Sequence, residues 1–114
     1  MEVIFKYLPE FERRAKVLAK KYKSFIKDYN ALLVSLASSP FQGTSLGSGI
    51  YKIRIPISSK SKGKSGGARV LTFNIIKKSP DRIIITFLTI FDKSEMDNVS
   101  DAYIRSIIKE AKKG

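Results

Sequence analysis

The spacing of hydrophobic residues changes along the chain, and each change predicts a new element. Residues 3–7 alternate as in a strand, which Pro9 ends while starting a helix. Apolar residues then recur at helical spacing up to Tyr22 on an otherwise very basic helix. A second helix is predicted from the candidate N-cap Ser24 to the Ser38-Ser39-Pro40 group. The first forty residues therefore predict a strand followed by a helical hairpin.

The second half of the chain is dominated by period-two patterns. Residues 41–49 are rich in Gly and Ser and predict a surface loop. Strands are predicted from residue 50 to 57, from 69 to 76 and from 82 to 91, the last one apolar enough to be covered on both faces. Ser100-Asp101 marks the start of a final helix with an apolar stripe that runs to the C-terminus.

This order of elements predicts an α+β fold. We expect a small, mostly antiparallel four-stranded sheet, an N-terminal helical hairpin and a C-terminal helix, with the helices packed on one face of the sheet. Residues 1–114 contain no internal repeat and no long linker, so a single domain is predicted.

Charge narrows the class of partner. The chain has 22 Lys and Arg against 10 Asp and Glu, a formal charge of +12, and no acidic residue between Asp28 and Asp81. Within that segment Lys52 and Arg54 share one face of a predicted strand, and Arg69 begins the next strand. Lys60, Lys62 and Lys64 lie in the Ser/Gly-rich loop between the two strands. Such a cationic patch favours a polyanion, with nucleic acid as the first candidate.

The absent residue types exclude other chemistry. The sequence has no Cys and no His, which excludes disulfides, thiolate metal sites and imidazole catalysis, and no metal or cofactor is expected. The N-terminus lacks the pattern of a secretory signal, and the longest apolar run is too short to span a membrane. A cytoplasmic protein is expected.

Four short motifs, taken in order, resemble one family. They are Tyr51-Lys52-Ile53-Arg54, the loop ending at Lys64-Ser65-Gly66-Gly67-Ala68-Arg69-Val70, the strand 87–91, and Asp92-Lys93-Ser94-Glu95-Met96. Together they resemble the RelE/ParE superfamily of type II toxins, and within it the HigB-like branch of RelE. The resemblance covers essentially the whole chain, because the predicted order of elements is also that of the family, and it implies a RelE-like fold.

The resemblance also implies a function and partners. Such toxins are ribosome-dependent endoribonucleases (mRNA interferases) that cleave mRNA in the ribosomal A site and so inhibit translation. They work without a metal, leaving a 2′,3′-cyclic phosphate and a 5′-hydroxyl end. A cognate antitoxin, expected to be a helix-turn-helix DNA-binding protein, holds them inactive.

Site residues follow by position. Lys52 and Arg54 match the family's paired strand cations, Arg69 matches its phosphate-holding arginine, and Lys93 and Glu95 fall in the motif after the last strand. The sequence departs from the best-known RelE pattern where Ser94 replaces an arginine and Ser100 replaces a tyrosine. The acid that protonates the leaving group is therefore unassigned.

Alternative interpretations remain for each cation. Lys52 and Arg54 are also compatible with a strand face that is merely solvated. The loop lysines at 60, 62 and 64 either dock on RNA backbone or keep a loop soluble. The cations of the first helix, from Arg13 to Lys23, either contact ribosomal RNA or face water. At the level of function, a ParE-like inhibitor of DNA gyrase and a non-catalytic RNA-binding module are the competing hypotheses.

Overall fold

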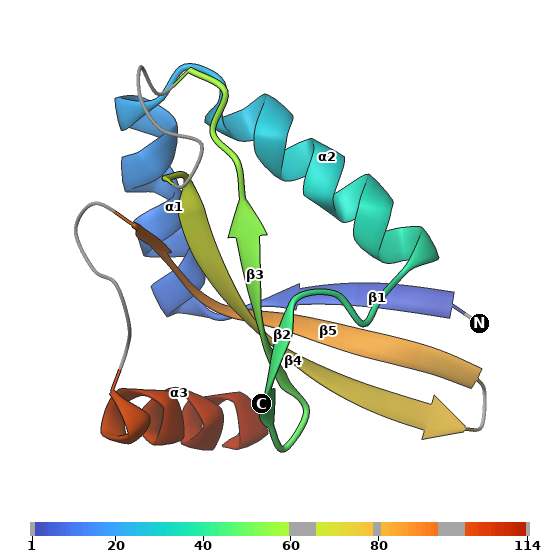
Figure 1. Cartoon of the computed structure of the whole chain (residues 1–114). Coiled ribbons are helices and arrows are strands. Elements are labelled where there is room, and N and C mark those ends of the chain that lie inside the picture. The colour runs from blue at the N-terminus through green and yellow to red at the C-terminus, as the bar shows by residue number, and fades with distance from the viewer. Residues whose placement is uncertain (1, 60–65, 79–80, 94–99, 114) are drawn as a thin grey trace.

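One mixed sheet organises the chain (Figure 1). The computed structural model describes residues 2–59, 66–78, 81–93 and 100–113. The elements described there are β1 (Glu2–Tyr7), α1 (Pro9–Lys21), α2 (Phe25–Ser38), β2 (Thr44–Gly47), β3 (Ile50–Ile55), β4 (Ala68–Lys78), β5 (Asp81–Asp92) and α3 (Asp101–Lys113). The strand order is β1-β5-β4-β3-β2, with β1 parallel to β5 and the other neighbours antiparallel. The predicted α+β class, helical hairpin and C-terminal helix are confirmed.

The predicted number of strands is wrong by one. β2 lies in the segment predicted as a loop, pairs with β3 at the edge of the sheet, and exposes all of its residues. A strand that buries no side chain needs no hydrophobic alternation, so the pattern that identifies the other strands does not reveal it.

Helices cover both faces of the sheet, which corrects the prediction of a single covered face. α1 and α2 bury Phe11, Phe25 and Leu36 against the strands on one face. α3 packs on the opposite face, where Ile107 contacts the cluster of Leu71 and Leu88. Figure 1 shows α3 on the far side of the strands from α2. The nearly continuous apolar sequence of β5 is explained by this double coverage.

A β-bulge in β5 decides which residues reach which face. Leu71 pairs with Thr89 and Thr72 with Phe87, so Leu88 is an extra residue in β5. Ile85 and Phe87 before the bulge, and Ile90 after it, belong to the core beneath α1 and α2. Because alternation resumes after the bulge, Thr89 and Phe91 point to the α3 face.

The helix starts follow the sequence signals in part. Pro9 begins α1, and the Ser100 hydroxyl accepts a 3.0 Å hydrogen bond from the backbone N–H of Tyr103 in the first turn of α3. Ser24 does precede α2, but its hydroxyl donates to Asp28 at 2.7 Å and does not cap a helix N–H.

Gly67 joins the ends of three strands. Its φ is +74°, and a Cβ at this position would lie 2.3 Å from the carbonyl oxygen of Ile55. Its own carbonyl accepts a 3.1 Å hydrogen bond from the N–H of Lys93. Only glycine allows β3, β4 and the end of β5 to approach this closely.

The substitution Gly67→Ala is expected to lower the free energy of unfolding by about 2–4 kcal/mol, because positive φ costs about 1–2 kcal/mol and the backbone clash adds to it. Gly47→Ala is the matched control, since Gly47 has φ +89° and nothing within 4 Å of the added Cβ. Urea titrations of both variants measure the difference. Equal losses would show that close approach at Gly67 contributes nothing.

Candidate functional site

The cations at 52, 54 and 69, called here the strand cation cluster, lie on one face of the sheet. Arg54 and Arg69 are direct cross-strand partners, and Lys52 pairs with Leu71. Because Leu71 packs beneath α3, the cluster lies on the α3 face, beyond the part that the helix covers with apolar side chains. Arg54 is exposed, and Lys52 and Arg69 are half-buried.

The register places like charges opposite one another. Directly paired residues of antiparallel strands have Cα atoms about 4.5–5.5 Å apart, and like charges in such a pair destabilise a sheet. Replacing either arginine of the Arg54–Arg69 pair by a neutral residue would remove this repulsion. The arrangement therefore suits an anion that bridges the two guanidinium groups.

Local backbone atoms fix the direction of Arg69. Its Nη1 donates to the carbonyl of Gly66 at 2.9 Å and to that of Ala68 at 3.3 Å. Lys93 is tied to the same end of the sheet by its bond to Gly67. Four of the residues selected from sequence thus come from three neighbouring strand ends.

The remaining selected residues lie outside the described residues. They are Glu95 and the loop lysines 60, 62 and 64. Their roles stay predictions from sequence.

A second group of charges, which includes two of the basic residues of the first helix, surrounds Glu10. One carboxylate oxygen of Glu10 accepts from Arg13 at 2.7 Å, and the other accepts from Arg14 Nε at 2.6 Å and from the Tyr103 hydroxyl at 2.8 Å. Tyr103 also lies 3.1 Å from the Thr89 hydroxyl. This Glu10 network joins α1, β5 and α3. The spacing of Glu10 from the two arginines is the i, i+3 and i, i+4 spacing of helix ion pairs, a signal that the sequence does contain.

The electrostatics of the network keep Glu10 ionised. The hydrogen bond from Arg14, opposed by partial burial and helped by Arg13 and Tyr103, lowers the pKa of Glu10 from 4.5 to about 2. Burial is the main cause that raises the pKa of Tyr103, so its hydroxyl remains a donor. Ser100 stands where the resemblance described above would place a tyrosine. Three residues later, Tyr103 in the first turn of α3 brings a hydroxyl group to the sheet.

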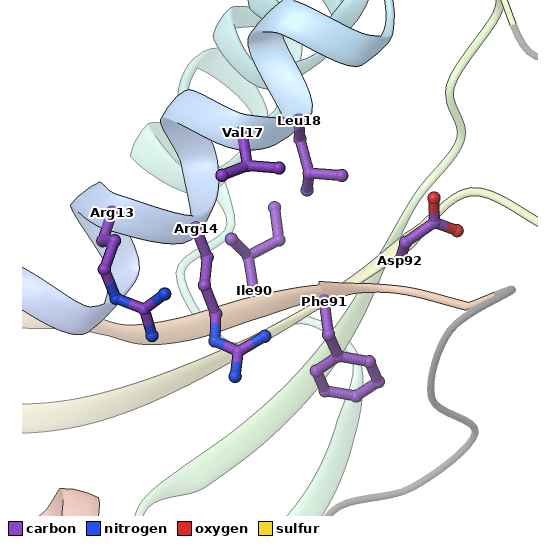
Figure 2. Close-up of a pocket in the computed structure, with 7 residues that line it drawn as sticks. All are labelled: Arg13, Arg14, Val17, Leu18, Ile90, Phe91 and Asp92. Carbon is purple, nitrogen blue, oxygen red and sulfur yellow. The ribbon is translucent and has the colours of Figure 1, made fainter.

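A pocket of about 260 Å³ opens between α1 and the end of β5. It is lined by Arg13, Arg14, Val17, Leu18, Ile90, Phe91 and Asp92, and is called here the α1–β5 pocket (Figure 2). The pairing of β1 with β5 ends at Phe87, so the pocket follows the edge of β5 beyond β1. Its lining includes residues from both faces of β5, which shows that it curves around this edge.

Asp92 brings a buried carboxylate to the pocket wall. Its side chain is 0% exposed and accepts from the Tyr22 hydroxyl at 2.5 Å and from Lys21 at 3.4 Å. Figure 2 shows the carboxylate directed away from the ring of Phe91. Asp92 therefore joins β5 to the end of α1 and contributes little negative charge to the opening.

Two aromatic residues near the cluster pack in the fold. Phe73 is half-buried against the α3-face cluster, and Phe91 is 3% exposed. The Phe91 ring therefore offers no free face of the kind that stacks on an extruded base.

Comparison with known proteins identifies the family. The sequence matches the family described as the RelE toxin of the RelE / RelB toxin-antitoxin system over residues 10–113, and the chain belongs to this family. The protein is therefore a toxin of a toxin–antitoxin system, and a cognate antitoxin is its partner. No curated protein matches the sequence at a significant level. Across the described part of the chain, no helix has the length and apolar character needed to cross a membrane.

The Glu10 network predicts a pH-dependent contribution to stability. Because folding lowers the pKa of Glu10, its stabilising effect is complete above about pH 4.5 and is lost as the pH falls toward about 2. We expect Glu10→Gln to be less stable than the wild type at neutral pH, with a difference that shrinks through this acidic range. Denaturant titrations across the range measure it, and Glu12→Gln on the exposed side of α1 is the control. A difference that stays constant with pH would contradict the assigned role of the carboxylate.

Proposed function

We propose that this toxin is a HigB-like mRNA interferase, which enters the ribosomal A site and cleaves mRNA without a metal ion. The observation that supports this most directly is the cross-strand pair Arg54–Arg69 with Lys52 on the same face. Membership of the RelE toxin family supplies the second argument. Such a protein acts where ribosomes translate, in the cytoplasm.

In the proposed reaction the RNA strand provides its own nucleophile. Lys52 in its neutral amine form takes the proton from the ribose 2′-hydroxyl, and the oxygen attacks the adjacent phosphorus. Arg54 and Arg69 stabilise the charge that develops on the phosphorane oxygens. The bond to the 5′-oxygen breaks, that oxygen gains a proton, and the products are a 2′,3′-cyclic phosphate and a 5′-hydroxyl end.

The residues after β5 complete the proposal. Lys93 adds a positive charge at the same end of the sheet, and Glu95 is the candidate for proton transfer to or from the reacting oxygens. The Glu95 assignment depends on its place in the sequence motif. The lysines at 60, 62 and 64 are proposed to contact RNA backbone, because they follow β3 directly in the chain.

The +12 charge also bears on the antitoxin. An acidic segment of the partner that covers the strand cation cluster would neutralise it and block RNA at once. We propose a helix-turn-helix DNA-binding antitoxin encoded next to the toxin, which sequencing of the neighbouring reading frame would reveal.

Substitution of the cluster tests the cleavage site. Lys52→Ala and Arg69→Ala are each expected to reduce cleavage of ribosome-bound mRNA by about 100-fold or more, because each removes a proton acceptor or an electrostatic contact used in the transition state. Primer extension on the mRNA measures cleavage, and growth arrest after induction reports it in cells. Lys77→Ala, at the exposed opposite end of β4, is the matched control.

Further outcomes separate the competing functions. Retained activity in both variants, with antitoxin binding intact, would overturn the site assignment. Growth arrest with DNA damage and continued translation would identify a gyrase inhibitor. Salt-dependent RNA binding without cut mRNA, even with ribosomes present, would identify a non-catalytic RNA-binding module.

A further inference from the structure

The α1–β5 pocket adjoins the strand cation cluster across a single residue. Arg69 is the cross-strand partner of Phe91, and Phe91 lines the pocket together with Arg13 and Arg14. Paired positions form a row across three adjacent strands, from Arg54 on β3 through Arg69 on β4 to Phe91 on β5. The two arginines of α1 lie beyond β5. Positive groups thus stand on both sides of the buried Phe91 ring.

The two α1 arginines have donor groups available on the pocket side. Arg13 uses Nη2 toward Glu10 while its side chain is 63% exposed, and Arg14 uses Nε toward the same carboxylate. Figure 2 shows both guanidinium groups reaching from α1 to the level of β5, with that of Arg14 next to Phe91. A guanidinium has five N–H donors in a planar fork, so a second anion can be bound while Glu10 stays in place.

The charge balance of the pocket favours an anion. Glu10 neutralises one of the two arginines, which leaves a net charge of +1 for the three groups. Asp92 also lines the pocket, but its buried carboxylate is paired with Lys21 and accepts a hydrogen bond from Tyr22.

We propose that the α1–β5 pocket is a second phosphate-binding site, formed by Arg13 and Arg14, which takes a phosphodiester of the RNA strand next to the one held by the strand cation cluster. The proposal rests on the function proposed above. It extends the RNA path from β3 across β4 and β5 to α1. The site fixes the register of the strand, and it contributes no group to the bond-breaking step.

Binding of a short single-stranded RNA tests the site separately from cleavage. The probe is a fluorescent oligonucleotide with 2′-O-methyl groups, which cannot be cut, and anisotropy is measured over a series of salt concentrations. Arg13→Gln is expected to weaken binding several-fold and to lower the slope of log K against log salt by about 0.7, the value for one phosphate contact on a single strand. Lys16→Gln removes the same charge from an exposed position of α1 outside the pocket lining, and is expected to leave the slope unchanged.

Two more variants are expected to change the affinity for the oligonucleotide in opposite directions. Arg13→Lys keeps the charge without the planar fork and is expected to fall between the wild type and Arg13→Gln. Glu10→Gln releases both arginines from their internal carboxylate and is expected to bind the oligonucleotide more tightly. Circular dichroism confirms that each variant is folded before binding is compared.

The remaining outcomes decide between sources of the phosphate. Equal slopes for Arg13→Gln and Lys16→Gln would overturn the proposal. Weaker binding to ribosomes with unchanged binding to the oligonucleotide would also overturn it, because the phosphate would then belong to ribosomal RNA. The cleavage assay on Lys52→Ala runs in parallel, so a failure of the proposed nuclease is seen independently of the slope.

Discussion

The bulge at Leu88 is the constraint on which the arrangement of this protein depends. It adds one residue to β5 and so reverses which side chains of residues 89–92 face each side of the sheet. Ile90 and Asp92 face α1, while Phe91 faces the side of Arg69. Without the extra residue, the polar and apolar positions of 89–92 would exchange faces. Asp92 would lose its partners on α1, and Arg69 would lose its buried neighbour.

Charge is distributed in two different ways around this strand. In the Glu10 network, two arginines share one carboxylate and a tyrosine hydroxyl, so most of the charge is compensated within the fold. In the strand cation cluster, two arginines are direct cross-strand partners, so the register of the sheet keeps their Cα atoms close. The first arrangement stabilises the fold, and the second gathers positive charge on one face of the sheet. The difference explains why the cluster is the stronger candidate for the reacting phosphate.

The sequence was sufficient where packing follows local periodicity. Buried stripes located all three helices, and alternation placed Lys52 and Arg54 on one face. β2 was not predicted because it buries no side chain. The placement of α3 on the opposite face was not predicted because the apolar sequence of β5 is compatible with helices on either face. The bulge leaves no signal in the residues of β5 themselves. It becomes visible only through the register with β4.

In the candidate site too, features set by neighbouring residues could be predicted from the sequence, and contacts between distant residues could not. The glycine at position 67 stands in one of the four sequence motifs, and the structure explains it, because a Cβ there would lie 2.3 Å from the carbonyl oxygen of Ile55. The spacing of Glu10, Arg13 and Arg14 was available in the sequence, whereas the bond from Tyr103 to Glu10 joins residues 93 positions apart. Contacts over such distances depend on the path of the whole chain, which short motifs do not contain.

The unequal size of the two cores has a consequence for the lifetime of the protein. α1 and α2 share a large buried cluster, whereas α3 is held by a few residues around Ile107 and by the Tyr103 hydroxyl. Detachment of α3 would therefore break fewer buried contacts than detachment of α1 and α2, and it would leave the larger cluster intact. A released α3 would expose its backbone to cellular proteases, which offers one route for degradation of the toxin.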